Sequence, residues 1–303
     1  MKIAISILLT ALTLFAKEMS PSDVYSQVTL LKEHAHYILK SYNVKHDHEG
    51  IETRVLSHTN LKPRNAFQKT YEIMIKLNVL RETHGMVRIE PVNIAPTLNL
   101  HPDLVYEQVR RLLEEFRIFE ARSDMKEETY KPMAFKGKTP VGVFNALSAV
   151  SEALDEINGG KFTPTYVYAE NIRALDDVTL ILNALRIEDN TIPAKIKKDA
   201  TSRDSFDVAI KTLQKIKQLQ ILSGIEHVDF SEFEKGAHAP SDVFTMTQMI
   251  LAELQTLKAY LKIDSSTVPA YLSDDKTPVE VNQLMGWNLI KLNQISSLIK
   301  EEK

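Results

Sequence analysis

The chain contains no cysteine, and this absence excludes several kinds of site. Without thiols it has no disulfides, no thiolate ligands for zinc or iron–sulfur clusters, no cysteine nucleophile and no lipid-modified N-terminal cysteine. Cysteine-free chains also suit a compartment that oxidises thiols. The composition is therefore compatible with export, and it leaves histidine as the main candidate ligand for a transition metal.

Glycine and net charge are also low. Only 9 of the 303 residues are glycine, against an average share of about 7%, which disfavours turn-rich β folds and glycine-lined nucleotide sites. The 37 lysines and arginines are balanced by 40 aspartates and glutamates, for a formal charge of -3. Nucleic-acid binding depends on a surplus of basic residues, so we expect no nucleic-acid partner.

The N-terminal segment has the layout of a secretory signal peptide. Lys2 is followed by about a dozen apolar residues that end at Ala16, before a polar stretch. We therefore expect residues 1–16 to direct export, to the periplasm in a Gram-negative source. Leu14 is larger than the small residue usual at that position, so retention as a membrane anchor stays open. No other stretch approaches a bilayer span, and we expect no stable transmembrane span after cleavage.

One short motif recurs eight times along the rest of the chain. It consists of a Ser, Thr or similar residue, Pro, two residues that often include an acid, a small apolar residue and usually an aromatic. This pattern is typical of a helix start, because Ser or Thr caps the first amides, Pro fits the first helical position and an acid favours the positive helix end. The copies predict eight helices, which start near Pro21, Pro63, Pro102, Pro140, Pro164, Arg203, Pro240 and Pro278.

After each motif, apolar residues recur at alternating spacings of four and three, which is the pattern of a helix-bundle core. Thr247 and Asn288 interrupt this pattern, and we interpret them as residues that set the register of packing. Glycines follow the expected ends of three helices, at Gly85, Gly159-Gly160 and Gly224. Glycine favours the left-handed turn after a helix, so these positions indicate helix ends.

The spacing of the helix starts indicates an internal duplication. The gap is short only between Pro140 and Pro164, and Lys138-Thr139-Pro140-Val141 recurs as Lys276-Thr277-Pro278-Val279. We therefore predict an all-α fold of two duplicated four-helix bundle units, residues 17–160 and 161–303. An α-solenoid of helical repeats is the alternative, because the regular period also fits stacked helical pairs. The long connectors are able to return along a helix, so parallel and antiparallel neighbours both stay open.

Two sets of residues are candidate sites. The segment His46, Asp47, His48 and Glu49 combines imidazoles with carboxylates, which are ligands for Zn²⁺ or Cu²⁺; an ordinary solvated loop is the alternative. The second set consists of aromatic side chains that are expected either to line an apolar pocket or docking face, or to close the ends of the core. These are Tyr25, Tyr106, Phe144, Tyr168, Phe244 and Trp287.

No catalytic motif stands out. Gly137-Lys138-Thr139 resembles the end of a phosphate-binding loop, but Pro132 occupies the place of its first glycine, and helix capping explains these residues better. There is no nucleophile elbow and no His-Glu-x-x-His pattern. We therefore predict a non-enzymatic, exported binding or scaffold module for another envelope component. The alternative is a helical protein that binds a small apolar ligand or a transition metal.

Overall fold

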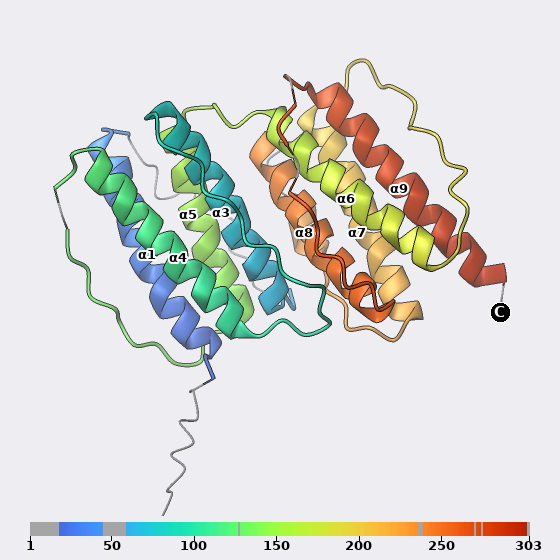
Figure 1. Ribbon diagram of the computed structural model, residues 1–303, viewed down its shortest axis with the longest axis horizontal. Helices are drawn as coiled ribbons and strands as arrows, with labels where there is room; N and C mark the ends of the chain where they lie inside the picture. Colours follow the sequence, from blue (N-terminus) through green and yellow to red (C-terminus); the bar gives the residue numbers. More distant parts are fainter. Residues whose placement is uncertain are drawn as a thin grey trace, which may run out of the picture.

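The computed structural model describes residues 18–44, 59–126, 128–235, 239–269, 271–273 and 275–301. Within these ranges the chain is all-α, and all eight predicted helix starts are confirmed (Figure 1). No helix in this part of the chain has the length and apolarity that a bilayer crossing requires. The helices are α1 (Pro21–Ser41), α3 (Pro63–Thr83), α4 (Pro102–Arg122), α5 (Pro140–Asn158), α6 (Pro164–Ala184), α7 (Ser202–Leu222), the short 3-10 helix η1 (Ser231–Lys235), α8 (Pro240–Tyr260) and α9 (Pro278–Glu301).

Local capping explains why the helices begin where they do. At α1, the amide of Asp23 donates to Ser20 Oγ, and the amide of Ser20 donates back to the Asp23 carboxylate at 2.9 Å. The same reciprocal cap forms between Thr201 and Asp204 at α7, which lacks the proline. Cap and acid therefore suffice to start α7, because they satisfy amides that have no partner within the helix.

The predicted helix ends at glycine are also confirmed. Gly85 and Gly224, which follow α3 and α7, have φ values of +65° and +69°. Side chains disfavour this left-handed conformation, and glycine adopts it without strain. Four other helices end with a non-glycine residue in the same conformation, namely Asn43, Asp124, Arg186 and Lys262.

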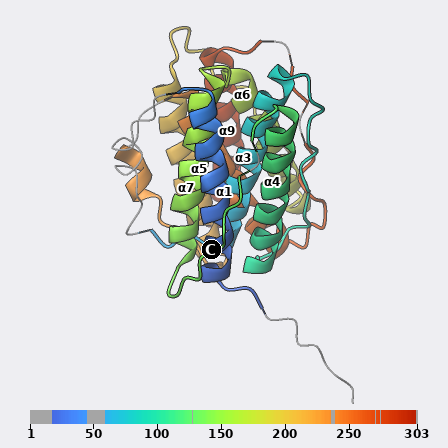
Figure 2. The same ribbon diagram turned by 90° about the vertical axis from the view of Figure 1, so that its left-hand side faces the viewer.

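The helices form two four-helix bundles. In the first bundle, α1 and α3 each pack against both α4 and α5 (Figure 2); in the second, α6 and α7 each pack against both α8 and α9. Within each bundle the four N-termini meet at one end, where the first residues of the helices surround a shallow hollow. All four helices of a bundle are therefore parallel, and each long connector returns the chain to the same end.

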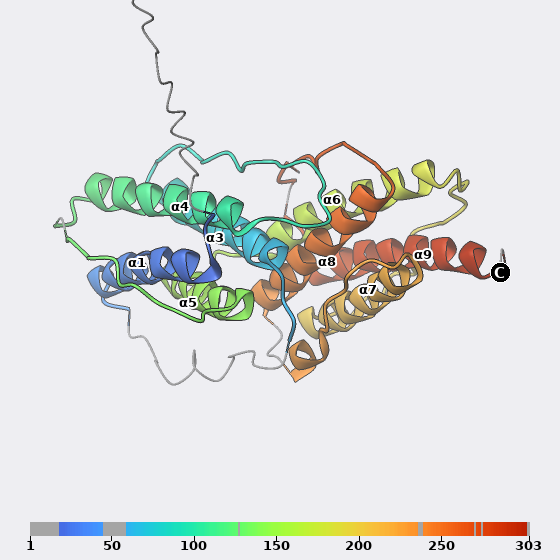
Figure 3. The ribbon, with the colours of Figure 1, turned by 90° about the horizontal axis from the view of Figure 1, so that it is seen from below.

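The two bundles run in opposite directions and meet through α3 and α8 (Figures 1 and 3). These two helices are antiparallel, since Arg64 near the start of α3 contacts Glu253 late in α8, while Lys76 contacts Ser241. Each is buried on nearly all sides. The short link at residues 159–163 explains the reversal, because it is too short to return along a helix.

Several contacts recur at positions that the predicted duplication relates. The amide of Lys138 donates to Ser22 Oγ at 3.0 Å, and the amide of Lys276 donates to Thr165 Oγ1 at 2.9 Å. The ammonium groups of these two lysines lie over the rings of Tyr25 and Tyr168, at 4.2 and 5.1 Å. The repeated Lys-Thr-Pro-Val segment thus fastens a connector to the first helix of its bundle. The duplication itself stays a prediction.

The connector at residues 185–201 is fastened to α9 by a row of polar contacts. Gln283 Nε2 donates to the carbonyl of Ala194 at 3.0 Å, and the indole of Trp287 donates to Thr191 Oγ1 at 2.9 Å. One turn further along α9, Lys291 pairs with Asp189. Side chains spaced along one face of a helix can hold an extended segment alongside it. Trp287 thus anchors this connector.

Gly286 allows the connector to approach α9 closely, and its replacement should separate the two. A Cβ at position 286 would lie 2.8 Å from the Cβ of Ala194. We expect Gly286→Ala to destabilise the protein by about 1 kcal/mol in urea unfolding, because the clash exceeds the gain in helix propensity.

Two matched variants test this explanation. The only contact of an added Cβ at Gly142 in α5 is at 3.8 Å, so Gly142→Ala should be neutral or stabilising. Ala194→Gly should rescue Gly286→Ala, because it removes the atom that clashes. If Gly286→Ala stabilises as Gly142→Ala does, the close approach is not a constraint.

Candidate functional site

The junction between α3 and α8 contains charged side chains that are shielded from solvent. Glu72 and Glu253 are 0% exposed, Lys258 is 0% exposed and Lys76 is 1% exposed. A buried charge is strongly unfavourable unless it has a partner and hydrogen bonds. Each of these four groups has partners, and most of those partners come from another helix.

Glu253 of α8 forms the first cluster. Its carboxylate accepts two hydrogen bonds from the Arg64 guanidinium, both at 2.9 Å, and one from Asn65 Nδ2 at 2.9 Å. Gln220 of α7 donates a fourth, at 2.7 Å. Paired hydrogen bonds between a guanidinium and a carboxylate are directional as well as strong. This cluster therefore holds the first turn of α3 in a defined position against α7 and α8.

Glu72 of α3 lies at the centre of the second cluster. Lys69 Nζ lies 2.8 Å from its carboxylate and Lys76 Nζ lies 3.1 Å away, while Ser151 of α5 and Thr245 of α8 donate from other helices. Burial alone would raise the pKa of Glu72, but the two ammonium groups lower it to about 2. The pKa of Lys69 is lowered, mainly by burial. Glu72 therefore carries a charge that the fold stabilises.

Lys76 also contacts two serines, an arrangement found in some hydrolytic sites. Its ammonium donates to Ser151 Oγ at 2.7 Å, to Ser241 Oγ at 2.5 Å and to Asp155 at 2.7 Å. A lysine activates a serine only when its amine is neutral. Burial would lower the pKa of Lys76, but Glu72 and Asp155 raise it above its usual value. The amine stays protonated, which favours a structural role for this cluster.

A third cluster fastens the connector at residues 261–277. Lys258 Nζ lies 2.6 Å from Asp177 of α6, and Thr267 of the connector donates to the same carboxylate at 2.5 Å. Gln255 Nε2 donates to both Asp177 and Thr267, at 2.8 and 2.7 Å. The buried pair of Asp177 and Lys258 thus holds α6 against α8 and also fixes the position of Thr267 in the connector.

The first bundle has a pair at the related positions. His34 Nδ1 of α1 lies 2.7 Å from Glu120 Oε1 of α4, and both residues are buried. Both bundles therefore have a buried pair at this point. In the first the acid is on α4 and its partner is on α1, whereas in the second the acid is on α6 and the lysine is on α8.

A hollow opens between α3, α8 and the connector at residues 84–101. It encloses about 260 Å³, including the part open to solvent. Phe67, Ile94 and Leu100 supply apolar walls, and Gln68 and Gln255 supply amides. The Oε1 atoms of both glutamines are buried and have no hydrogen-bond partner within the described residues. Because the space open to the centre of a water molecule is only about 10 Å³, the hollow suits a bound water that donates to these atoms.

Gln255 lies between two connectors. It lines the hollow with the connector at residues 84–101, and it donates to Thr267 of the connector at residues 261–277. Both connectors lie on the side of the molecule that faces the viewer in Figure 1. We call this side the connector face. The exposed large apolar side chains of these two connectors are Val87, Val92, Leu98, Val268 and Tyr271.

The structure does not bring the six predicted aromatic residues together. Phe144 and Phe244 are buried in the cores, whereas Tyr25, Tyr106 and Tyr168 are half-buried and pack at the edges of their cores. Phe135 contacts the Tyr25 ring edge-on at a centroid distance of 4.9 Å. Trp287 holds the connector on α9. Phe144, Phe244 and Tyr168 therefore share one core cluster, Tyr25 and Tyr106 pack against the other, and Trp287 lies on α9.

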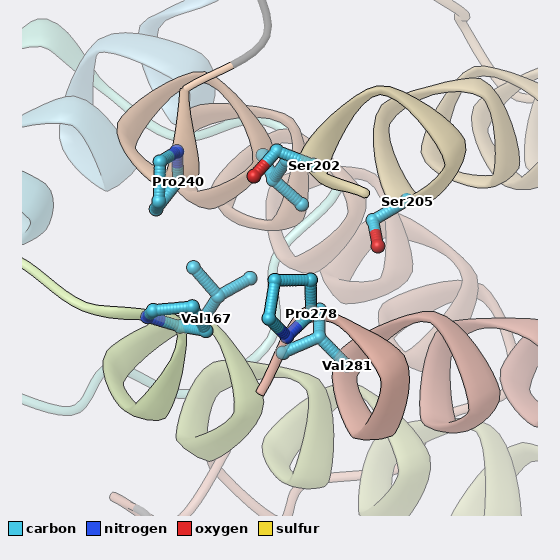
Figure 4. Close-up of a pocket in the computed structure, with 8 residues that line it drawn as sticks. Val167, Ser202, Ser205, Pro240, Pro278 and Val281 are labelled. Atoms are coloured by element: carbon cyan, nitrogen blue, oxygen red, sulfur yellow. The ribbon is translucent and has the colours of Figure 1, made fainter. Parts of the chain in front are cut away.

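The hollows at the bundle ends are lined by other residues of the repeated motif. In the second bundle the first residues of the four helices surround the hollow, together with Val167, Val243 and Val281 (Figure 4). The residue three positions after each proline thus points inward, and the aromatic that follows it points elsewhere. The helical period of 100° per residue separates these two directions.

The predicted metal residues His46, Asp47, His48 and Glu49 lie outside the described residues, so that site stays a prediction. In the described ranges there is no group of three or more His, Asp or Glu side chains placed to hold a metal ion.

The predicted role of Thr247 and Asn288 has a structural counterpart: Asn171 donates to Thr247 at 3.1 Å, and Asn288 donates to the carbonyl of Asn171 at 3.1 Å.

Sequence reasoning missed the buried charges of the junction. The signal was the helix Pro63–Thr83, in which charged and apolar residues share every face instead of separating into two. A helix with no clean apolar stripe is either exposed all round or buried among polar partners.

Comparisons with family models, with curated proteins and with solved structures give no match to this chain.

Proposed function

We propose that the protein is an exported, non-enzymatic binding or scaffold module for another component of the cell envelope. The connector face carries this proposal. Tyr271 is 95% exposed and Val268 is 66% exposed, although both belong to a connector that the Asp177 cluster holds in place. Apolar side chains displayed on a fastened loop favour contact with a partner, because each contributes about 1.5–3 kcal/mol when fully buried.

The junction supports the same function. A binding surface composed of segments from two bundles keeps its shape only if the bundles hold one relative position. The Glu253 and Glu72 clusters, with partners on α3, α5, α7 and α8, supply that restraint. Surfaces that are rigid before binding lose less conformational entropy on association.

A single cysteine at position 271 tests both export and partner binding, because the natural chain has none. In cells that produce Tyr271→Cys, a thiol reagent that crosses only the outer membrane should label the protein. A benzophenone attached at the same cysteine should then give one cross-linked product of defined mass.

Glu107→Cys on the outer face of α4 is the matched control, since Glu107 is also exposed. It should be labelled equally and give no such product. Labelling only after cell lysis contradicts export. A product that also forms at position 107, or none at position 271, contradicts a partner on the connector face.

A further inference from the structure

A second exposed surface lies on the connector at residues 185–201. Its middle part, residues 191–198, reads Thr-Ile-Pro-Ala-Lys-Ile-Lys-Lys and contains no acid. Ile192 is 77% exposed and Ile196 is 59% exposed. Lys195, Lys197 and Lys198 are exposed as well. We call residues 191–198 the basic strap.

The basic strap is held against the body of the protein. Trp287 binds Thr191 and Gln283 binds the carbonyl of Ala194, while Gly286 leaves room for the Ala194 side chain. The connector runs along the outer side of α9, at one end of the long axis of the molecule (Figure 1). Ala194 is thus the inward residue, and the two isoleucines on either side of it are displayed to solvent.

Two acidic groups near the strap have basic partners, whereas Asp199, directly after it, is exposed and also lies near Lys197. Asp204 accepts from Lys197 at 2.6 Å, and Asp189 pairs with Lys291 of α9. The remaining strap lysines, Lys195 and Lys198, are exposed beside the isoleucines. Residues 191–199 thus combine two exposed isoleucines with three lysines against one aspartate, although the whole chain is slightly acidic.

We propose that the basic strap binds an anionic phospholipid surface. Apolar side chains that enter the interface and lysines that meet anionic headgroups are the two contributions that hold peripheral proteins on such membranes. Charge complementarity distinguishes the strap from the connector face, whose exposed charged residues include the acids Glu90, Asp264 and Asp275. Membrane contact here goes beyond the proposed partner binding and does not require it.

The test uses the whole chain with a single cysteine that carries an environment-sensitive fluorophore such as NBD. Labels at Ile192→Cys and Ile196→Cys should shift to the blue when vesicles with 30% phosphatidylglycerol are added, and not with pure phosphatidylcholine vesicles. High salt should weaken the effect, because it screens the lysines. In the Ile192→Cys chain, Lys195→Gln and Lys198→Gln should each lower the partition coefficient about fivefold.

Labels at Val87→Cys and Val268→Cys are the matched controls, because both sites are exposed apolar positions on other connectors. They should not shift. If the apolar N-terminal segment alone attaches the protein to vesicles, the protein will sediment with them without a shift at position 192, and the proposal is wrong. A shift at position 192 that needs a protein from an envelope extract, and not lipid, would also overturn it.

Discussion

Replacing Glu253 with glutamine should lower the free energy of unfolding by about 3 kcal/mol. The substitution keeps the shape of the side chain but leaves the Arg64 guanidinium buried without a counter-charge. Removal of one partner of a buried ion pair typically costs about 3–5 kcal/mol. The new amide also presents donors toward Gln220 and Asn65, which are themselves donors to Glu253. Urea unfolding at pH 7 measures the change.

Glu115→Gln is the matched control for Glu253→Gln. Glu115 occupies the related position in α4 and pairs with Arg81 at 3.0 Å, but the two side chains are 19% and 10% exposed. Partly solvated pairs contribute less, so we expect a loss of about 1 kcal/mol or less. Hydrogen exchange should rise along α3 and α8 in Glu253→Gln. Equal losses in the two variants would show that burial at the junction is not decisive.

Acidification should weaken the fold through Glu72. Its pKa in the folded protein is about 2, below the ordinary value of 4.5. The unfolded chain therefore takes up a proton first as the pH falls, and the stability contributed by Glu72 is complete above about pH 4.5. It is lost as the pH falls toward 2, and it amounts to about 3 kcal/mol. Glu72→Gln should be less stable at pH 7 and should show a flatter dependence on pH between 5 and 2.

Thr245→Val is the control for Glu72→Gln. Thr245 donates to Glu72 at 2.9 Å and carries no charge. Its loss should lower stability by about 1 kcal/mol at pH 7 and leave the steep dependence between pH 5 and 2 in place. The two variants are compared by chemical denaturation across this range. If Glu72→Gln retains the slope of the parent protein, Glu72 does not account for it.

The outer faces of the helices explain why α8, and not α4, is covered by a neighbouring bundle. Where α8 has Thr245, Gln248 and Ala252, the related positions of α4 are Glu107, Arg110 and Glu114, all exposed. Burial of these three charges without partners would be strongly unfavourable. The α4 face is thus compatible with solvent, whereas the α8 face has partners on α3, α5 and α6.

Most of the helical structure followed from local signals. The starts at Pro21 and Pro240, the cap at Thr201 and the turn at Gly224 depend on contacts within four residues, so the printed order of residues is sufficient to predict them. Recurrence of Lys-Thr-Pro-Val predicted a relation between the halves in the same way. The aromatic positions were less informative, because Phe244 and Tyr25 differ in burial although their motifs match.

The sequence by itself therefore determined the all-α class and the helix starts, since capping and periodicity are short-range effects. Only the tertiary structure decided that the helices of each bundle are parallel, because a connector of a dozen or more residues reaches either end of a helix. It also decided the junction. Glu253 and Arg64 are 189 residues apart along the chain, and a charge with a distant partner looks in sequence like any solvated charge.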